Sequence, residues 1–173
     1  MRVNRFHRLL AACLLLGSLT ATTAAAQDAG AGPRVARKKP APSPLRLRFI
    51  GLAQDPAHGK QITRCSFREA WIGLRLEKAG VLVGPITRDS SGAAEFIDGK
   101  GTPWDVKGFH SERPVQEGGF LLSRAIEKIE GEIAGGQNVI LDDRKLSAVH
   151  AEVLAQFIAK QEWSSRIRWY HGN

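Results

Sequence analysis

Apolar and polar positions alternate along the chain with two different periods, which predict helices and short strands in turn. Helical spacing of apolar residues is found in three segments: 66–79, 120–134 and 147–161. The first has a capping-box spacing at Ser66 and Glu69, and Gly80 follows its last turn. Short apolar runs predict strands in four segments: 45–52, 81–87, 137–141 and 166–170. The pattern therefore predicts a chain of both helices and strands.

The stretch AAEFIDGKGTPWDVKG, residues 93–108, predicts a β-hairpin. Strands at 93–98 and 102–107 would flank a Gly-Lys-Gly turn, with Phe96 opposite Trp104 and Glu95 opposite Asp105. Period-two alternation then separates the side chains by face. One face carries core residues: Phe96, Trp104 and Val106. The other face brings together two carboxylates and an ammonium: Glu95, Asp105 and Lys107.

The order of elements predicts a mixed α/β (α+β) fold in which helices flank a mixed sheet. The hairpin is antiparallel, and it is followed by a helix, a strand, a helix and a last strand. A strand, helix and strand at this spacing form a crossover unit, which implies parallel pairing and a right-handed connection.

Residues 1–26 have the pattern of a secretory signal peptide. Three arginines precede an apolar run over 9–19, and Ala24 to Ala26 precede Gln27 as a cleavage site. The apolar run is too short to span a bilayer, so we expect a secreted protein with no stable membrane span. Cleavage leaves Cys65 as the one cysteine, which excludes an intramolecular disulfide in that mature chain.

Charge is unevenly distributed along the sequence. Of 25 Lys and Arg residues, 3 lie in 1–26 and 6 in 27–48, which leaves 16 in 49–173. Of 17 Asp and Glu residues, only Asp28 precedes residue 49, which also leaves 16. We therefore expect a basic Pro/Ala/Gly-rich linker over 27–48 and a formally neutral folded domain over 49–173. The high pI alone does not indicate a nucleic-acid-binding surface on that domain.

The predicted hairpin face has a chemical use. Phosphodiester hydrolysis needs a divalent cation that offsets phosphate charge and lowers the pKa of an attacking water, and carboxylates are the ligands that Mg²⁺ prefers. An ammonium beside them can hold the water or stabilise developing negative charge. Glu95 and Asp105 are thus candidate Mg²⁺ ligands, and Lys107 is a candidate catalytic residue. The alternative is a surface hairpin with an ordinary charged outer face.

These residues also resemble a known family. The AEFID and WDVK segments resemble the motif of PD-(D/E)xK nucleases, and their Phe-Ile, Gly-rich turn and Trp are most similar to toxin nuclease domains of bacterial contact-dependent growth inhibition systems. On this resemblance Glu95 stands at the family's first Asp, and Asp105 and Lys107 are its (D/E) and Lys. The sequence departs from the family at Ala94-Glu95, where Pro-Asp would stand, so Asp98 is a backup ligand.

The resemblance covers about residues 67–170 and implies the restriction-endonuclease-like αβββαβ core. It implies a metal-dependent endonuclease that cleaves tRNA, or DNA, in competitor cells, and a cognate immunity protein that protects the producer. Family members often draw a further acid from the helix before the sheet, which would be Glu69; otherwise Glu69 only caps its own helix.

Other interpretations remain open. The chain could be a catalytically inactive secreted binding module on a nuclease-like fold, or a periplasmic protein whose hairpin matches by chance. Asp142, Asp143 and Arg144 follow a predicted parallel strand, where open sheets bind ligands, although polar turn residues are common there. Three aromatic residues could stack on bases or pack in the core: Trp163, Trp169 and Tyr170.

Overall fold

The computed structural model describes residues 41–172. The expected signal peptide, and the expected linker up to residue 40, lie outside the described residues. Within them the four α-helices are α1 (Pro44–Ala53), α2 (Arg64–Lys78), α3 (Leu122–Ala134) and α4 (Ala148–Ile158). The strands are β1 (Thr87–Arg88), β2 (Phe96–Ile97), β3 (Pro103–Gly108), β4 (Asn138–Asp142) and β5 (Ile167–Tyr170). Short 3₁₀ helices are Pro56–His58, Val115–Glu117 and Glu162–Arg166.

The strands form one mixed sheet in the order β1-β2-β3-β4-β5. β1, β2 and β3 pair antiparallel, whereas β3, β4 and β5 pair parallel through α3 and α4. The predicted mixed α/β class and parallel crossover are therefore confirmed. The predicted pairing of Phe96 with Trp104 is also confirmed, although β2 is only two residues long.

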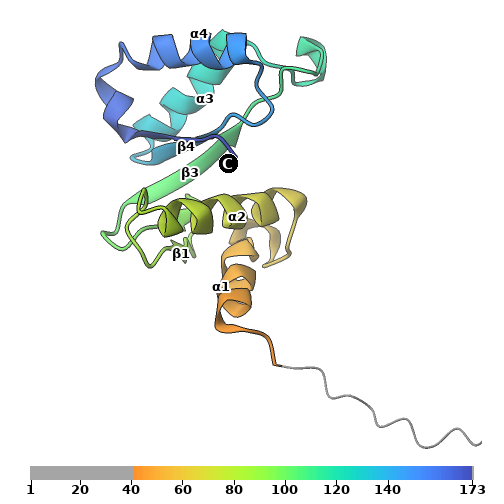
Figure 1. The fold of residues 1–173 in the computed structure, drawn as a ribbon, viewed down its shortest axis with the longest axis vertical. Helices are drawn as coiled ribbons and strands as arrows, with labels where there is room; N and C mark the ends of the chain where they lie inside the picture. The colour runs from red at the N-terminus through yellow and green to blue at the C-terminus, as the bar shows by residue number, and fades with distance from the viewer. Residues whose placement is uncertain (1–40, 173) are drawn as a thin grey trace, which may run out of the picture. The chain divides into compact units, whose positions relative to one another are not determined.

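Two helical layers cover the sheet, with α1 and α2 on one side and α3 and α4 on the other (Figure 1). Alternation along each strand supplies a core to both layers. The core beside α1 and α2 includes Leu52, Ala70, Ile72, Phe96, Trp104, Val106, Ile140 and Tyr170. The core beside α3 and α4 includes Phe120, Ala125, Ile129, Val139, Leu141, Leu154 and Ile167. No helix in the described range is long and apolar enough to cross a membrane.

Helix α2 begins two residues earlier than its sequence pattern predicts, because Thr63 is the N-cap. The Thr63 hydroxyl accepts a hydrogen bond from the Ser66 backbone N–H at 3.0 Å, and the Ser66 hydroxyl accepts one from the Thr63 N–H at 2.9 Å. This reciprocal pair is a capping box that does not use Glu69. The carboxylate of Glu69 is therefore available for contacts elsewhere.

Two of the predicted strands are wrong. Residues 45–52 belong to α1, which Ser43 caps and Pro44 starts; their Leu-Arg alternation imitates a strand, but the helix packs Leu52 and Ala53 against α2. Of residues 81–87, only Thr87 is in a strand. Gly84 and Pro85 interrupt the run, and the N–H of Ile86 donates to the Glu77 carboxylate rather than to a neighbouring strand.

Candidate active site

Strand β3 places Asp105 and Lys107 on the face of the sheet that α3 covers. The Asp105 side chain is buried, and the Lys107 Nζ lies 2.7 Å from its Oδ2. The same Nζ lies 2.6 Å from Oε1 of Glu132, which α3 supplies. Burial alone would lower the pKa of Lys107, but Asp105 and Glu132 outweigh that effect and raise it. Lys107 is therefore a fixed cation at neutral pH.

Glu95 reaches the same place from the bend before β2. Its Oε2 accepts a hydrogen bond from the Val106 backbone N–H at 3.0 Å. Its own N–H donates across to the Trp104 carbonyl at 3.0 Å, but the backbone bends at Glu95, so the strand that the sequence predicts from residue 93 begins only at Phe96. Because β2 begins only at Phe96, the backbone N–H of Val106 in β3 is bound by the Glu95 side chain. This hydrogen bond holds the Glu95 carboxylate beside Asp105.

The environment of Glu95 opposes its ionisation. Burial, followed by hydrogen bonding to Asp105 and repulsion from Asp105 and Glu69, raises the pKa of Glu95 to about 9. The Val106 N–H offsets part of this shift. Adjacent carboxylates that are at least partly buried and lack a cation between them bind protons in this way. They also form a site that a cation would stabilise.

Glu69 approaches this pair from α2. It is buried, with the Arg88 Nη1 3.5 Å from its Oε2, and Arg88 also lies 3.4 Å from Asp55. Burial raises the pKa of Glu69 and Asp105 adds to the shift, while Arg88 and Arg68 lower it in part. The structure thus brings together four of the candidate residues: Glu69, Glu95, Asp105 and Lys107.

Asp98, the backup candidate, lies elsewhere. Its Oδ1 accepts hydrogen bonds from the backbone N–H groups of Lys100 and Thr102, and its Oδ2 accepts one from the indole N–H of Trp104. Burial would raise the pKa of Asp98, but these donors lower it. The carboxylate therefore closes the hairpin turn on the core side of the strand, and it is not directed at Asp105.

Sequence reasoning did not find two charged residues at the site, Glu132 and Arg88. Glu132 belongs to the polar face of a predicted helix, where acids are ordinarily solvated. The topology could have indicated Glu132. The helix of a crossover unit packs on the sheet beside the strand that precedes it, so α3 had to lie near β3. Arg88 is the last residue of β1. The apolar pattern predicted a strand that ends at Thr87, so it left Arg88 outside.

Comparisons with models of protein families, with curated proteins and with solved structures found no match.

The donor set at this site fits Mg²⁺. Within residues 41–172, no group of three or more His, Cys, Asp and Glu side chains is arranged to hold a metal ion. Mg²⁺, however, is usually bound through one or two carboxylates, completed by waters and substrate phosphates. Glu95 and Asp105 supply two, and the Lys107 ammonium lies 2.7 Å from the buried Asp105 Oδ2, where it would share that oxygen with a bound ion. The two residues that the sequence nominated as ligands are thus adjacent and able to accept a cation.

A second buried acid, Asp142 at the end of β4, has a different environment. Its carboxylate accepts hydrogen bonds from Arg144 Nε at 2.7 Å and Nη2 at 2.8 Å, and Arg68 Nε lies 3.7 Å away. Burial would raise the pKa of Asp142, but Arg144 and Arg68 outweigh it and lower the pKa. This carboxylate is therefore neutralised within the protein.

Proposed function

We propose that the chain is a metal-dependent nuclease that hydrolyses phosphodiester bonds at the Glu95–Asp105–Lys107 site. The observation that carries this proposal is the convergence of a buried carboxylate, Asp105, and an adjacent partly buried one, Glu95, with a lysine that has a raised pKa. Perturbed titratable groups gathered in this way are typical of catalytic sites. A solvated outer hairpin face would not bury these acids.

The topology supports the proposal. An α-helix, three antiparallel strands, a second helix and a parallel strand follow one another as α2, β1, β2, β3, α3 and β4. This is the αβββαβ order that the resemblance to PD-(D/E)xK nucleases implies, with the motif residues on β3 and in the bend before β2. Glu69 on α2 takes the place of the further acid from the preceding helix.

Each residue has a distinct role in the proposed reaction. Glu95 and Asp105 would hold Mg²⁺, with Glu69 adding negative charge beside them. The bound ion would offset the charge of the scissile phosphate and lower the pKa of water. Lys107 remains protonated, so it acts as a hydrogen-bond donor and a positive charge near the phosphate rather than as a general base. Glu132 fixes the position of the Lys107 ammonium.

The biological setting follows from the resemblance and from the N-terminal sequence. We infer a secreted antibacterial toxin that acts on tRNA, or on DNA, in the cytoplasm of a competitor cell. A cognate immunity protein would protect the producing cell. The arginine-led apolar segment before Gln27 supports export.

The test is cleavage of total tRNA and of plasmid DNA by the purified full-length chain, with Mg²⁺ and with EDTA. We expect cleavage of one substrate with Mg²⁺ and none with EDTA. The variant Asp105→Asn keeps the shape of the side chain and removes the charge, so cleavage should fall at least 100-fold, by analogy with the loss of one transition-state contact.

The matched control is Asp143→Asn, which removes one carboxylate from the partly exposed turn after β4. Cleavage by this control should stay within about threefold of the unaltered chain. Circular dichroism establishes that both variants are folded. Intact tRNA and DNA under every condition, with folded protein, would refute the nuclease and favour the catalytically inactive binding module.

A further inference from the structure

Charge is segregated between the two helical layers, although the folded domain is nearly neutral. Residues 44–79, which contain α1 and α2, hold seven Lys and Arg residues against three acids. Residues 120–163, which contain α3 and α4, hold five Lys and Arg residues against seven acids. All three acids of the first layer are paired with cations: Asp55 and Glu69 with Arg88, and Glu77 with Arg48. The α1–α2 layer therefore presents unbalanced positive charge.

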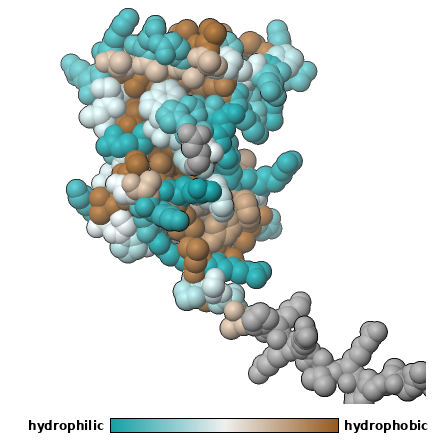
Figure 2. Space-filling model, viewed as in Figure 1, coloured by the Kyte–Doolittle hydropathy of each residue, from teal (hydrophilic) through white to brown (hydrophobic). Residues whose placement is uncertain are grey.

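The outer side of α2 concentrates this charge beside an aromatic ring. Five residues spaced three or four apart form what we call the α2 ridge: Arg64, Arg68, Trp71, Arg75 and Lys78. Trp71 is 43% exposed, and the Arg75 guanidinium lies 4.9 Å from the centre of its ring. No carboxylate of the described residues pairs with Arg75 or Lys78. Figure 2 shows hydrophobic and hydrophilic residues side by side over this layer.

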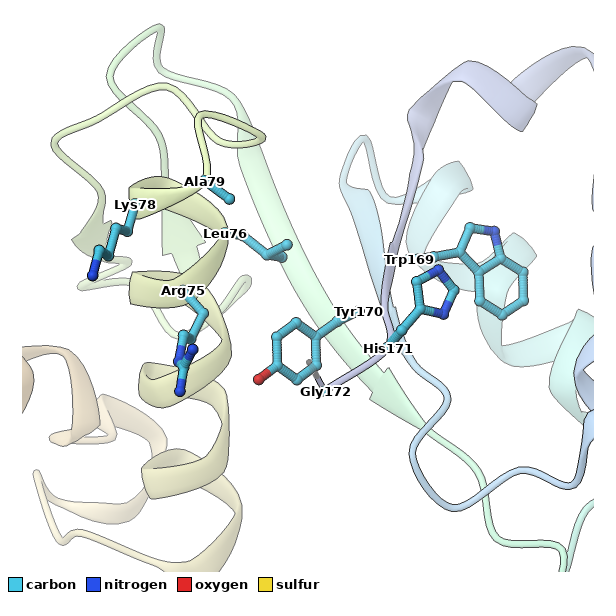
Figure 3. Close-up of a pocket in the computed structure, with 8 residues that line it drawn as sticks. All are labelled: Arg75, Leu76, Lys78, Ala79, Trp169, Tyr170, His171 and Gly172. Atoms are coloured by element: carbon cyan, nitrogen blue, oxygen red, sulfur yellow. The ribbon is translucent and has the colours of Figure 1, made fainter.

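Two pockets flank the ridge, and Arg75 and Lys78 line both. One, of about 410 Å³, lies between α2 and the end of β5, where the Tyr170 ring points toward the helix (Figure 3). The other, of about 750 Å³, is lined by Phe49 and Trp71 between α1 and α2. Both have the size of small-molecule sites and combine aromatic walls with cations.

The ridge touches β3 at one residue, and the charge of Arg68 also acts on the buried Glu69, whose pKa it lowers in part. The Arg68 guanidinium packs on Gly108, where a Cβ would lie 2.8 Å from Arg68 Nη1. Gly108 directly follows Lys107 in β3. From Arg68 to Arg75 the helix rises about 10 Å, so the ridge is long enough to contact several successive nucleotides.

We propose that single-stranded nucleic acid binds along the α2 ridge, with phosphates on Arg75 and Lys78 and a base stacked on Trp71. Unpaired cations beside an exposed aromatic ring are the combination that binds single strands, because phosphates need charge and bases need a flat apolar surface. This inference rests on the proposed nuclease function and specifies how its substrate is held outside the active site.

The test is the fluorescence anisotropy of a labelled, unstructured eight-nucleotide RNA mixed with the full-length chain in EDTA, so that cleavage does not interfere. Replacing Arg75 and Lys78 by Ala should weaken binding at least tenfold. It should also reduce the slope of log K against log salt by about 1.4, since each single-strand phosphate contact contributes about 0.7. Trp71→Ala should weaken binding roughly tenfold through lost stacking.

The matched control replaces Lys128 and Lys160 by Ala, which removes two exposed cations from the opposite layer. The basic residues at 34–39 are present in every variant, so differences between variants report on the ridge. Equal weakening by control and ridge variants, or RNA binding that the ridge variants leave unchanged, would overturn the inference. Ridge-dependent binding to vesicles containing phosphatidylglycerol, without RNA binding, would also overturn it and indicate a membrane surface.

This inference and the proposed function can fail separately. If tRNA or DNA is cleaved but the ridge variants bind RNA and cleave as the unaltered chain does, the ridge is not a substrate site and the nuclease stands. If the ridge binds RNA and neither substrate is cleaved, the nuclease fails and the chain is a nucleic-acid-binding module.

Discussion

Two buried acidic sites lie in the same sheet and differ in what surrounds them. At the end of β4, Asp142 faces Arg144 and Arg68, and its pKa is lowered. Beside β3, Glu95 faces Asp105 and Glu69, and its pKa is raised to about 9. The first site is neutralised by the protein itself. At the second site one cation, Lys107, lies close to several carboxyl groups. The site therefore retains negative charge that an external ion can balance.

The difference separates stability from chemistry. Burial of an acid says little about its role, because both Asp105 and Asp142 are about 6% exposed. The partners differ: the Asp142 carboxylate accepts two hydrogen bonds from one guanidinium, which balance its charge and satisfy both of its oxygens. The contrast supports a structural role for Asp142 and the catalytic role that we propose for the β3 site.

The largest expected effect is the loss of cleavage in Lys107→Met. Methionine keeps most of the length of the side chain but has no charge, so the positive group beside Asp105 disappears. The cleavage rate at saturating substrate should fall about 100- to 1000-fold, as when one preorganised electrostatic contact is removed. Single-turnover assays with tRNA or DNA measure this rate directly.

The matched control for Lys107→Met is Arg144→Met. It also removes a cation that contacts a buried acid, but at the neutralised site. Cleavage by this variant should remain within about threefold of the unaltered chain. If both variants lose activity to the same extent, the two acidic sites are not functionally different and the contrast is wrong.

A smaller effect is expected on the stability of the Asp142→Asn variant. Removing this charge leaves Arg68 and Arg144 without their anion in a partly buried position. The penalty for breaking a fully buried pair is about 3–5 kcal/mol, and partial hydration of the half-buried Arg144 and Arg68 reduces it here to about 2 kcal/mol. Urea denaturation at pH 7 measures the loss of unfolding free energy.

The same variant should show how the Asp142 contribution depends on pH. Because the folded-state pKa of Asp142 lies below its ordinary value of 3.8, its stabilisation is fully present above about pH 5. It is lost as the pH falls through the folded-state pKa. The difference between the unaltered chain and Asp142→Asn should therefore shrink between pH 5 and pH 3. A difference that is constant over this range would mean that Asp142 does not act through its charge.

The sequence predicted the features that depend on local chemistry. The register of Phe96 with Trp104 followed from a three-residue turn, and the start of α4 next to Ser147 followed from the onset of an apolar pattern there. The parallel arrangement of β3, β4 and β5 followed from crossover spacing. Because alternation also fixes which side chains share a strand face, the approach of Asp105 and Lys107 could be predicted.

Features that depend on tertiary contacts could not be predicted. The alternating residues 45–48 became helical because α1 packs on α2, which no local pattern records. The apolar spacing over 66–79 does not tell which large residues are buried: Phe67 and Trp71 are exposed, whereas the small residues Ala70 and Gly73 face the sheet. Likewise, the role of Glu132 depends on how α3 lies against β3.

The smallest expected effect is a gain in stability from Glu95→Gln, of about 1 kcal/mol in urea denaturation at pH 7. A carboxyl at this position costs free energy, because it either repels Asp105 or must bind a proton that the unfolded chain would release. Glutamine avoids both costs, keeps an oxygen for the Val106 N–H and can donate its amide N–H to Asp105.

The control is the exposed Glu152→Gln, which should change stability by less than about 0.5 kcal/mol. If Glu95→Gln is destabilising, Glu95 is an ordinary satisfied acid. If it is stabilising and abolishes cleavage, the chain keeps an unfavourable carboxyl pair because the reaction needs it.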